Sequence, residues 1–322
     1  MGNTHNLTLI ILLIVAASLI VVGSCMFVVT MSIVNWDFSV LGTPNETNVH
    51  TPSADFNSIS ISTSTADITL LPSEDEICSV VCVDQENLTH SVTVVDGVLK
   101  IEKIDSRTWY DHITLFSRPT SITVYLPRSE YTSLYVNSST SDVKLSSGFT
   151  FNSIDVTLST GDFDVEGVTT GALSISVSTG NVSAKSTTCG GEVFVKVSTG
   201  NVNLTDTTCK NLTTSGTTGD ITLTSVIASE SFSIERSTGD VKLDGCNAST
   251  LNIKAGTGDV CGTLLSEKIF FTSTSTGKVS VPRSVSGGSC DISTTTGNPI
   301  IISIIVLAKH LNCIIIPICS LI

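Results

Sequence analysis

A glycine recurs at a nearly constant spacing through the second half of the chain, and this spacing constrains the fold more than any other feature. Successive glycines are separated by 19, 20, 19, 20, 19, 19 and 20 residues. A repeat of about 20 residues is typical of a solenoid, because one repeat is too small to bury its own apolar face and must stack on its neighbours. The eight glycines are Gly161, Gly180, Gly200, Gly219, Gly239, Gly258, Gly277 and Gly297.

Apolar and polar residues alternate on both sides of each glycine. In one repeat Ile154, Val156 and Leu158 precede the glycine. Phe163 and Val165 follow it. This period of two predicts two strands per repeat with one buried face each, and therefore an all-β, single-stranded parallel β-solenoid. Counted from the glycine, the buried positions are at odd offsets before it (−7, −5, −3) and at even offsets after it (+2, +4). We therefore predict a corner at which glycine supplies a positive φ and the buried phase changes.

An aspartate or asparagine usually follows the glycine, and we expect it to bond to the backbone of its own corner. In three consecutive repeats this residue is Asp220, Asp240 and Asp259, whose carboxylates would stand about 5 Å apart in stacked coils. These three are the candidates for the alternative interpretation, a stripe of oxygen ligands for calcium. In sequence order the series runs Asp162, Asn181, Asn201, Asp220, Asp240, Asp259, Lys278 and Asn298.

The chain begins with an apolar segment, from Leu7 to Val34, that contains no charged side chain. It is long enough to span a bilayer as a helix, so we predict a transmembrane anchor. A cleaved signal peptide is the alternative. The first Lys or Arg of the chain is Lys100, so flanking charge does not orient the anchor.

We predict five segments along the chain. Ala66 and Ser141, which are 75 positions apart, hold the glycine position in two degenerate copies of the corner, and the chain between these copies lacks the motif. Such atypical units are expected at the ends of a solenoid, where they hide the exposed edges. The segments are 1–36 (short tail and transmembrane anchor), 37–55 (linker), 56–130 (N-terminal cap and irregular β coils), 131–298 (regular β-solenoid) and 299–322 (apolar C-terminal tail).

The apolar tail 299–322 differs from the rest of the chain. Lys309 and His310 interrupt its apolar runs, and Pro317 would disturb a helix. Three interpretations stay open: a C-terminal cap strand, a second membrane span, or an aberrant end such as a frameshift product. We favour the cap or the aberrant end, because two spans would tether both ends of the solenoid to the membrane.

The composition suits a display module outside the cytoplasm. The net charge of −13 argues against binding to nucleic acid or to an anionic membrane surface. Cys189 and Cys209 share one phase of the repeat, so we predict that they stack inward as small apolar side chains. A local disulfide between Cys78 and Cys82 is an alternative for that pair. We expect no cofactor, because no nucleotide loop or zinc-type set of cysteine pairs is present.

The repeated corner, the single N-terminal span and the segment Asp105–Ile113 followed by Ile122–Pro127 resemble a bacterial family of putative adhesins with β-strand repeats, grouped under a domain of unknown function. The resemblance covers roughly residues 56–297. It implies a β-solenoid ectodomain on a membrane anchor, sometimes encoded beside envelope-stress or transcription regulators, and it implies no established activity. The last corner departs from the pattern, because Pro299 stands where a β-branched residue is expected.

The least repetitive chemistry of the chain lies in one short cluster before the regular repeats. Such a mixed polar and aromatic cluster could bind a glycan, or it could plug the cap with Trp109 over the core and Arg107 paired with Asp111. The cluster consists of Arg107, Trp109, Tyr110, Asp111 and His112.

We therefore expect a non-catalytic adhesin or cell-envelope interaction scaffold. It would be single-pass in the cell membrane with an extracytoplasmic C-terminal domain, and its partner would be a glycan or cell-surface ligand. A regulatory partner in envelope-stress sensing, bound to a membrane regulatory protein, is the first alternative. A polysaccharide-active β-helix enzyme is the second, and it would need a special carboxylate pair rather than an even ladder of acids.

Overall fold

The computed structural model describes residues 2–33, 35–36, 45–106 and 119–303, which belong to two units. The first unit holds helix α1 (Gly2–Ile33). Its segment Leu12–Ile33 is long and apolar enough to cross a membrane, a property that a signal sequence near the N-terminus would share. In the described part of the second unit, the regular elements are all strands.

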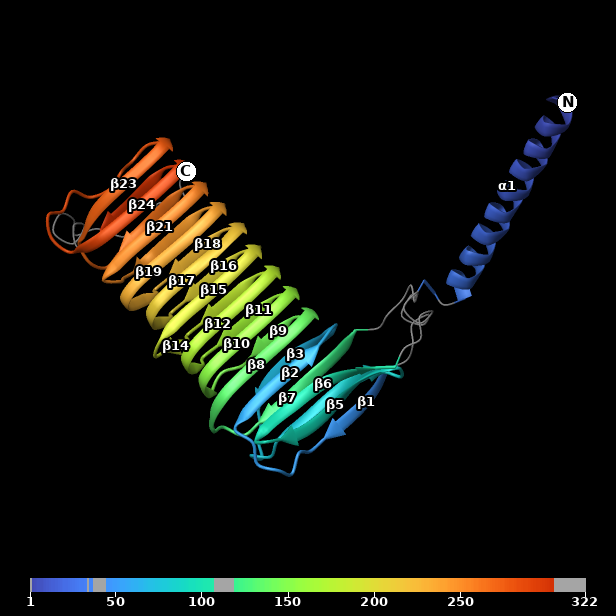
Figure 1. Ribbon diagram of the computed structural model, residues 1–322, viewed down its shortest axis with the longest axis horizontal. Helices are drawn as coiled ribbons and strands as arrows, with labels where there is room; N and C mark the ends of the chain where they lie inside the picture. The colour runs from blue at the N-terminus through green and yellow to red at the C-terminus, as the bar shows by residue number, and fades with distance from the viewer. Residues whose placement is uncertain (1, 34, 37–44, 107–118, 304–322) are drawn as a thin grey trace. The chain divides into compact units, whose positions relative to one another are not determined.

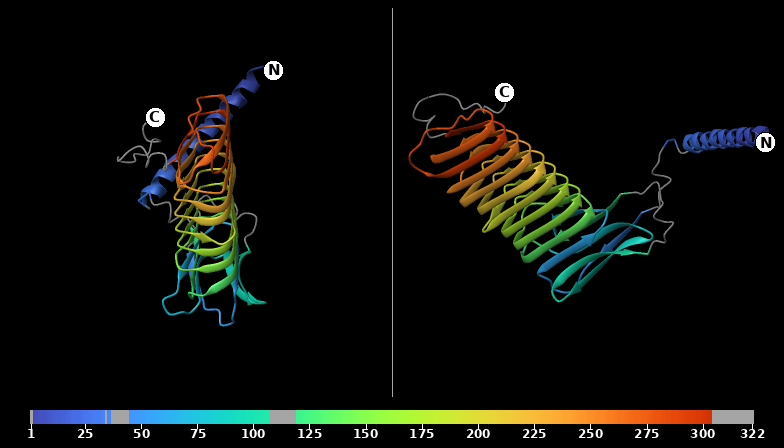
Figure 2. Two further views of the ribbon diagram at one scale, coloured as in Figure 1. Left: turned by 90° about the vertical axis from the view of Figure 1, so that its left-hand side faces the viewer. Right: turned by 45° about the horizontal axis from the view of Figure 1, so that its top comes forward.

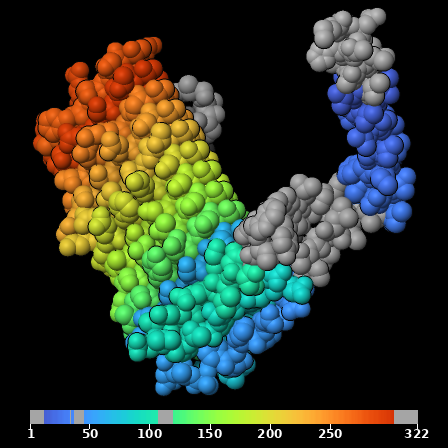
Figure 3. All heavy atoms as spheres, turned by 45° about the vertical axis from the view of Figure 1, so that its right-hand side comes forward, coloured from blue at the N-terminus to red at the C-terminus, as the bar shows by residue number. Residues whose placement is uncertain are grey.

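The strands confirm the predicted parallel β-solenoid, with about eight turns (Figures 1 and 2). Equivalent residues of successive coils pair in parallel, one repeat apart, so that Leu173 lies between Ile154 and Val193. The heavy-atom surface of this unit is continuous along the stack (Figure 3). We define two faces of each coil by the strand before the corner, the long-strand face, and the strand after it, the short-strand face.

The order of the strands on each face follows from their pairings. The long-strand face contains, in spatial order, β5 (Leu88–Val95), β6 (Val98–Asp105), β2 (Ser58–Thr63), β8 (Glu130–Thr140), β10 (Thr150–Thr160), β12 (Thr169–Thr179), β15 (Glu192–Thr199), β17 (Thr208–Thr218), β19 (Ile227–Thr238), β21 (Thr250–Thr257), β24 (Gly288–Thr296) and β23 (Lys268–Thr276). The short-strand face contains β1 (Asn45–His50), β4 (Ser79–Gln85), β7 (Thr120–Leu126), β3 (Ala66–Pro72), β9 (Val143–Leu145), β11 (Phe163–Glu166), β13 (Val182–Lys185), β16 (Val202–Thr205), β18 (Ile221–Thr224), β20 (Val241–Cys246), β22 (Val260–Leu264) and β25 (Pro299–Ser303). The short strand β14 (Thr188–Cys189) pairs with β12 and β17.

The core is a thin stack of side chains between the two faces. In one coil Val156 and Leu158 point inward from β10, and Phe163 and Val165 point inward from β11; all four are at most 2% exposed. Burial of such a side chain contributes roughly 1.5–3 kcal/mol, so each added coil extends the core by several favourable terms. Neither strand could hold this arrangement alone, because half of its surface is apolar.

The eight corner glycines share one conformation and one neighbour. Their φ angles lie between +119° and +157°, in the region that favours glycine. A Cβ atom on any of them would overlap the carbonyl oxygen of the corner residue in the coil stacked before it; for Gly219 that atom is the oxygen of Gly200. Glycine is therefore required twice at each corner, once for the turn and once for the close approach of the next coil.

At the N-terminal end the chain order and the spatial order of the coils differ. The degenerate coil of β2 and β3 stacks directly on β8 and β9, with Ile61 opposite Val136. The intervening chain folds onto the opposite side of that coil, where β6 pairs with β2 and β7 with β3. Strands β4, β5 and β6 form antiparallel pairs and close the end of the stack.

Strand β1 corrects one prediction. Asn45–His50 lies inside the segment 37–55 that we predicted to be a linker, yet it forms a strand that pairs with β4. An uncovered strand edge exposes unpaired N–H and C=O groups, and β1 covers the outer edge of β4. The sequence of β1 is polar because the strand is mostly exposed, so its composition suggested a linker.

The chain order is also exchanged at the C-terminal end. Strand β24 pairs with β21 on one side and β23 on the other, so the Gly297 corner lies between the Gly258 and Gly277 corners (Figure 1). Two strands per repeat were predicted, but after Gly277 the second strand is reduced to one bridge, between Ser280 and Ile300. Pro282 follows at once and cannot donate a ladder hydrogen bond. Of the apolar tail, residues 299–303 form β25, and residues 304–322 lie outside the described structure.

The corner geometry predicts a large effect of a single methyl group. Gly219→Ala should lower the free energy of unfolding by about 3 kcal/mol or more, because the added Cβ meets both an unfavourable φ and the oxygen of Gly200. Gly245→Ala is the matched control: this glycine has a φ of +62° with no atom within 4 Å of the added Cβ, so the expected loss is about 1 kcal/mol. Denaturant unfolding of both variants measures the difference. Equal losses would contradict the close-approach argument.

Candidate functional site

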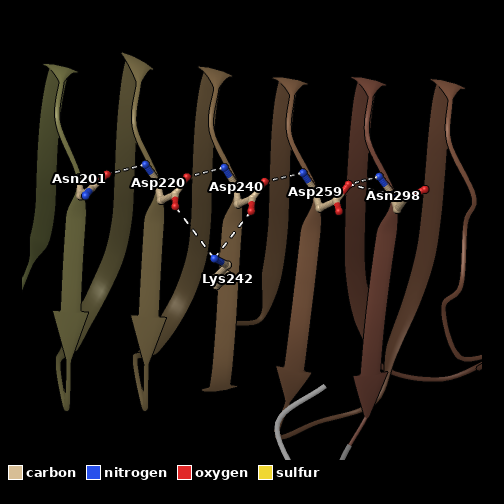
Figure 4. Close-up of polar contacts among 6 residues, drawn as sticks. All are labelled: Asn201, Asp220, Asp240, Lys242, Asp259 and Asn298. Atoms are coloured by element: carbon tan, nitrogen blue, oxygen red, sulfur yellow. Dashed lines mark hydrogen bonds and ion pairs between the residues drawn. The ribbon is translucent and has the colours of Figure 1, made fainter. Parts of the chain in front are cut away.

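The residues after the corner glycines form one continuous line of hydrogen bonds along the solenoid (Figure 4). The Oδ1 atom of Asp220 accepts from the backbone N–H of Asp240 at 2.9 Å, and Oδ1 of Asp240 accepts from the N–H of Asp259 at 3.0 Å. Asn201 does the same for Asp220 at 2.8 Å. The prediction that each side chain bonds to its own corner is therefore wrong. We call this line the corner ladder, and its bonds join neighbouring coils.

The ladder is longer than the repeat suggested, and its last two members are exchanged. Asn298 donates its backbone N–H to Asp259, and Lys278 donates its own N–H to Asn298. Lys278 cannot accept a hydrogen bond, and it occupies the end of the ladder, where no acceptor is needed. In spatial order the ladder consists of Asp67, Asp142, Asp162, Asn181, Asn201, Asp220, Asp240, Asp259, Asn298 and Lys278.

The calcium candidates Asp220, Asp240 and Asp259 lie in a row within this ladder. The Oδ1 atom of each accepts a hydrogen bond from a backbone N–H of the next coil. The Oδ2 atoms of Asp220 and Asp240 lie 4.0 and 3.7 Å from the amine of Lys242, which is more than one-third exposed (Figure 4). Among the described residues, the ligand-type atoms that converge belong to a different group, described next. The three carboxylates thus fit a solvated structural role better than a cation site.

That group lies buried in the N-terminal cap. The imidazole Nδ1 of His90 (β5) lies 2.6 Å from Oδ1 of Asp84 (β4), and Nε2 lies 2.7 Å from the hydroxyl of Thr63 (β2). The backbone N–H of His90 also donates to Asp84 Oδ2. With a proton on Nδ1, the imidazole donates to the carboxylate and accepts from the hydroxyl, so each polar atom has a partner. Cys82 stands beside this triad, with its sulfur within 4.8 Å of the Asp84 and His90 atoms.

The order carboxylate, imidazole, hydroxyl is the one that acyl-transfer enzymes use, but its burial does not suit a substrate. Thr63 is 8% exposed, His90 5% and Asp84 0%. Both imidazole nitrogens are also occupied, which leaves no lone pair for a metal. We did not foresee this group from the sequence. The available signal was Asp84 at the inward phase of a strand whose other inward residues are Val80 and Cys82.

An open groove lies on the long-strand face of the last coils, lined by described residues. Its volume is about 290 Å³, and it spans β21, β24 and β23. One rung of outward residues contains Asn252, Asp291 and Phe271 side by side. The ring of Phe271 is 59% exposed and stands among polar side chains, including Lys254. The exchanged order of β23 and β24 brings these residues together.

In the described part of the solenoid unit, the free cysteines are buried. This confirms the prediction for Cys189 and Cys209. Cys78 and Cys82 are both free, so the alternative of a local disulfide is wrong. Burial raises the pKa of the Cys209 and Cys290 thiols to about 12, and that of the Cys246 thiol to about 11. The cluster predicted to bind a glycan or plug the cap, Arg107 with 109–112, lies outside the described residues.

Stacked two-faced coils, glycine corners and strand caps define the class as a parallel β-solenoid. The chain belongs to the Toastrack DUF4097 family, which matches residues 56–190 and 171–301. This confirms the resemblance drawn from the repeated corner. No curated protein matches the chain.

Three solved structures match about four-fifths of this chain. A "putative lipid binding protein" from Parabacteroides distasonis has a TM-score of 0.52 and 17% identity, with 80% of this chain and 96% of that chain covered. A "putative adhesin" from Bacteroides fragilis has a TM-score of 0.46 and 16% identity, with 80% and 97% covered. A "putative adhesin" from Parabacteroides merdae has a TM-score of 0.48 and 14% identity, with 79% and 96% covered. At these identities the first likeness shows a shared fold alone.

The corner ladder predicts that Asp240 stabilises the fold through its hydrogen-bond acceptor rather than its charge. Asp240→Ala should lower the free energy of unfolding by about 1 kcal/mol, because the N–H of Asp259 loses its acceptor. Asp240→Asn keeps an acceptor, as Asn201 does naturally, and should change stability little. Chemical denaturation of the two variants compares these effects. Millimolar calcium should leave the wild-type midpoint unchanged, and a calcium-dependent rise lost in both variants would support a cation stripe instead.

The buried thiols predict a loss of stability at alkaline pH. In the unfolded chain thiols release their protons near the ordinary pKa of 9.0, whereas the folded chain holds them to about 11 or 12. Between these values the unfolded state binds fewer protons, so the free energy of unfolding should fall as pH rises above about 9. Cys209→Ala and Cys290→Ala together should flatten this fall, measured by denaturant unfolding between pH 8 and 10.5. An unchanged slope would contradict it.

Proposed function

We propose that the protein is a membrane-anchored, extracytoplasmic β-solenoid that acts as an adhesin or envelope-interaction scaffold without catalysis. The observation that carries this proposal is the groove on the last coils, where Phe271 presents an exposed ring beside Asn252 and Asp291. A flat apolar ring flanked by hydrogen-bonding groups suits one face of a sugar, which is also apolar in the middle and polar at its edge. The ligand class is therefore a surface glycan.

Two further observations support the proposal. The apolar segment Leu12–Ile33 of α1 suits an anchor that would hold the solenoid at the membrane. The carboxylates of the ladder are evenly spaced and bound to backbone N–H groups, whereas glycoside hydrolysis needs one pair in different environments.

The test is glycan-array and whole-cell binding by the full-length chain in detergent micelles or nanodiscs. Phe271→Ala should weaken binding about tenfold or more, because removal of the ring removes the stacking surface. Tyr135→Ala is the matched control, since Tyr135 is an exposed aromatic residue on β8 of the same face, outside the groove. Equal binding by wild type and Phe271→Ala would overturn the assignment of the groove.

Other outcomes would indicate a different class of function. Absence of binding to any glycan or cell, together with co-purification of a membrane protein, would favour a regulatory partner in envelope-stress sensing. Binding to lipid vesicles alone would favour the property named for the Parabacteroides distasonis structure. Cleavage of an acidic polysaccharide that one carboxylate substitution abolishes would overturn the non-catalytic proposal.

A further inference from the structure

Among the described residues, one arginine interrupts the apolar core of the solenoid. Arg236 lies on β19 three residues before Gly239, at an inward position, and it is 1% exposed. The equivalent position of the other regular coils holds small or apolar residues. In the neighbouring coils these are Leu158, Val177, Val197, Gly216 and Ala255.

Gly216 makes room for this arginine. It is the residue paired with Arg236 on the preceding coil, and a Cβ atom there would overlap the guanidinium. The side chain therefore crosses Gly216 and reaches the coil beyond it, where Nη1 donates to the carbonyl oxygen of Val197 at 3.0 Å. A glycine and a long cation on adjacent coils thus replace two ordinary apolar residues.

The remaining edge of the guanidinium has no protein partner. Both Nε and Nη2 of Arg236 are buried without a hydrogen-bond partner among the described residues. These two N–H groups lie along one edge and point in parallel, which is the fork that grips a planar oxyanion. The hydroxyl of Thr214 is likewise buried and unpartnered, and Thr214 sits two residues before Gly216 on the same inward phase.

No carboxylate of the ladder fills this role. Asp220 is the acid whose charge acts on Arg236, but its Oδ1 accepts from Asp240 and its Oδ2 faces Lys242. An arginine does not release its proton inside a protein, so the buried charge persists. A buried, uncompensated charge is strongly unfavourable.

We propose that this edge of Arg236, with the Thr214 hydroxyl, is an internal binding site for a small monovalent anion of the nitrate, formate or bicarbonate class. The fork supplies two donors and the hydroxyl a third. Because the site is closed to solvent, the anion enters during folding or when a coil opens, and it stabilises the folded chain by mass action.

The test uses the full-length chain in non-ionic detergent, refolded in sodium gluconate and in nitrate at equal ionic strength. The thermal midpoint should rise saturably with nitrate, by about 3 °C or more. Arg236→Met removes the cation while keeping an unbranched side chain, and should abolish this rise. Lys196→Met is the control: it removes an exposed cation of β15, and the nitrate-dependent rise should persist in this variant. An identical wild-type midpoint in both salts, or a full rise in Arg236→Met, would overturn the proposal.

If Arg236→Met does not fold, two further measurements test anion binding at this site. Thr214→Val removes the third donor, so half-saturation should require several-fold more nitrate. Crystals of the full-length chain grown in nitrate should show a planar density peak within hydrogen-bonding distance of Nε and Nη2. Unchanged half-saturation in Thr214→Val, or no peak at this position, would show that the edge binds no anion.

Discussion

The close contact of backbone with backbone at the corner is the constraint on which the rest of the structure depends. Every corner glycine except Gly277, which belongs to the last coil, donates its N–H to the threonine oxygen of the adjacent coil, as Gly219 does to Thr238 at 3.0 Å. The missing Cβ of Gly239, the corner glycine of that adjacent coil, allows this coil to approach the carbonyl oxygen of Gly219. The ladder side chain of Asp220 then ties the same two coils together a second time. Once the corners stack, the apolar rungs on both faces align without further specification.

The two ends show how the same constraint can be met in a different chain order. At the N-terminal end, β6 and β7 stack outside a coil that precedes them in sequence; at the C-terminal end, β24 enters between β21 and β23. The corner of Gly297 still meets Gly258, and that of Gly277 meets Gly297, with the same overlap of Cβ and oxygen. Identical corners make neighbouring coils interchangeable partners. The exchange at the C-terminal end creates the groove around Phe271.

The polar groups inside the stack fall into two kinds. In the cap, His90 joins Asp84 and Thr63 in a group whose atoms satisfy one another, so its burial needs no ligand. In the regular coils, Arg236 makes one bond and leaves one edge free, with Gly216 placed to admit it. The first group explains how a cap can hold polar side chains. The second identifies the coil at which the core is chemically unlike its neighbours.

The sequence alone determined the local unit: the two strands, the inward phase of Val156 and Phe163, and the corner at Gly161, because each depends on residues a few positions apart. It could not determine which coils touch, because the corners are nearly identical and any one could pair with another. Tertiary structure decided that Asn298 follows Asp259, that Asn45–His50 is a strand, and that Phe271 joins Asn252. The physical reason is that stacking energy depends on neighbours in space, which a repeat of equal units does not encode in its order.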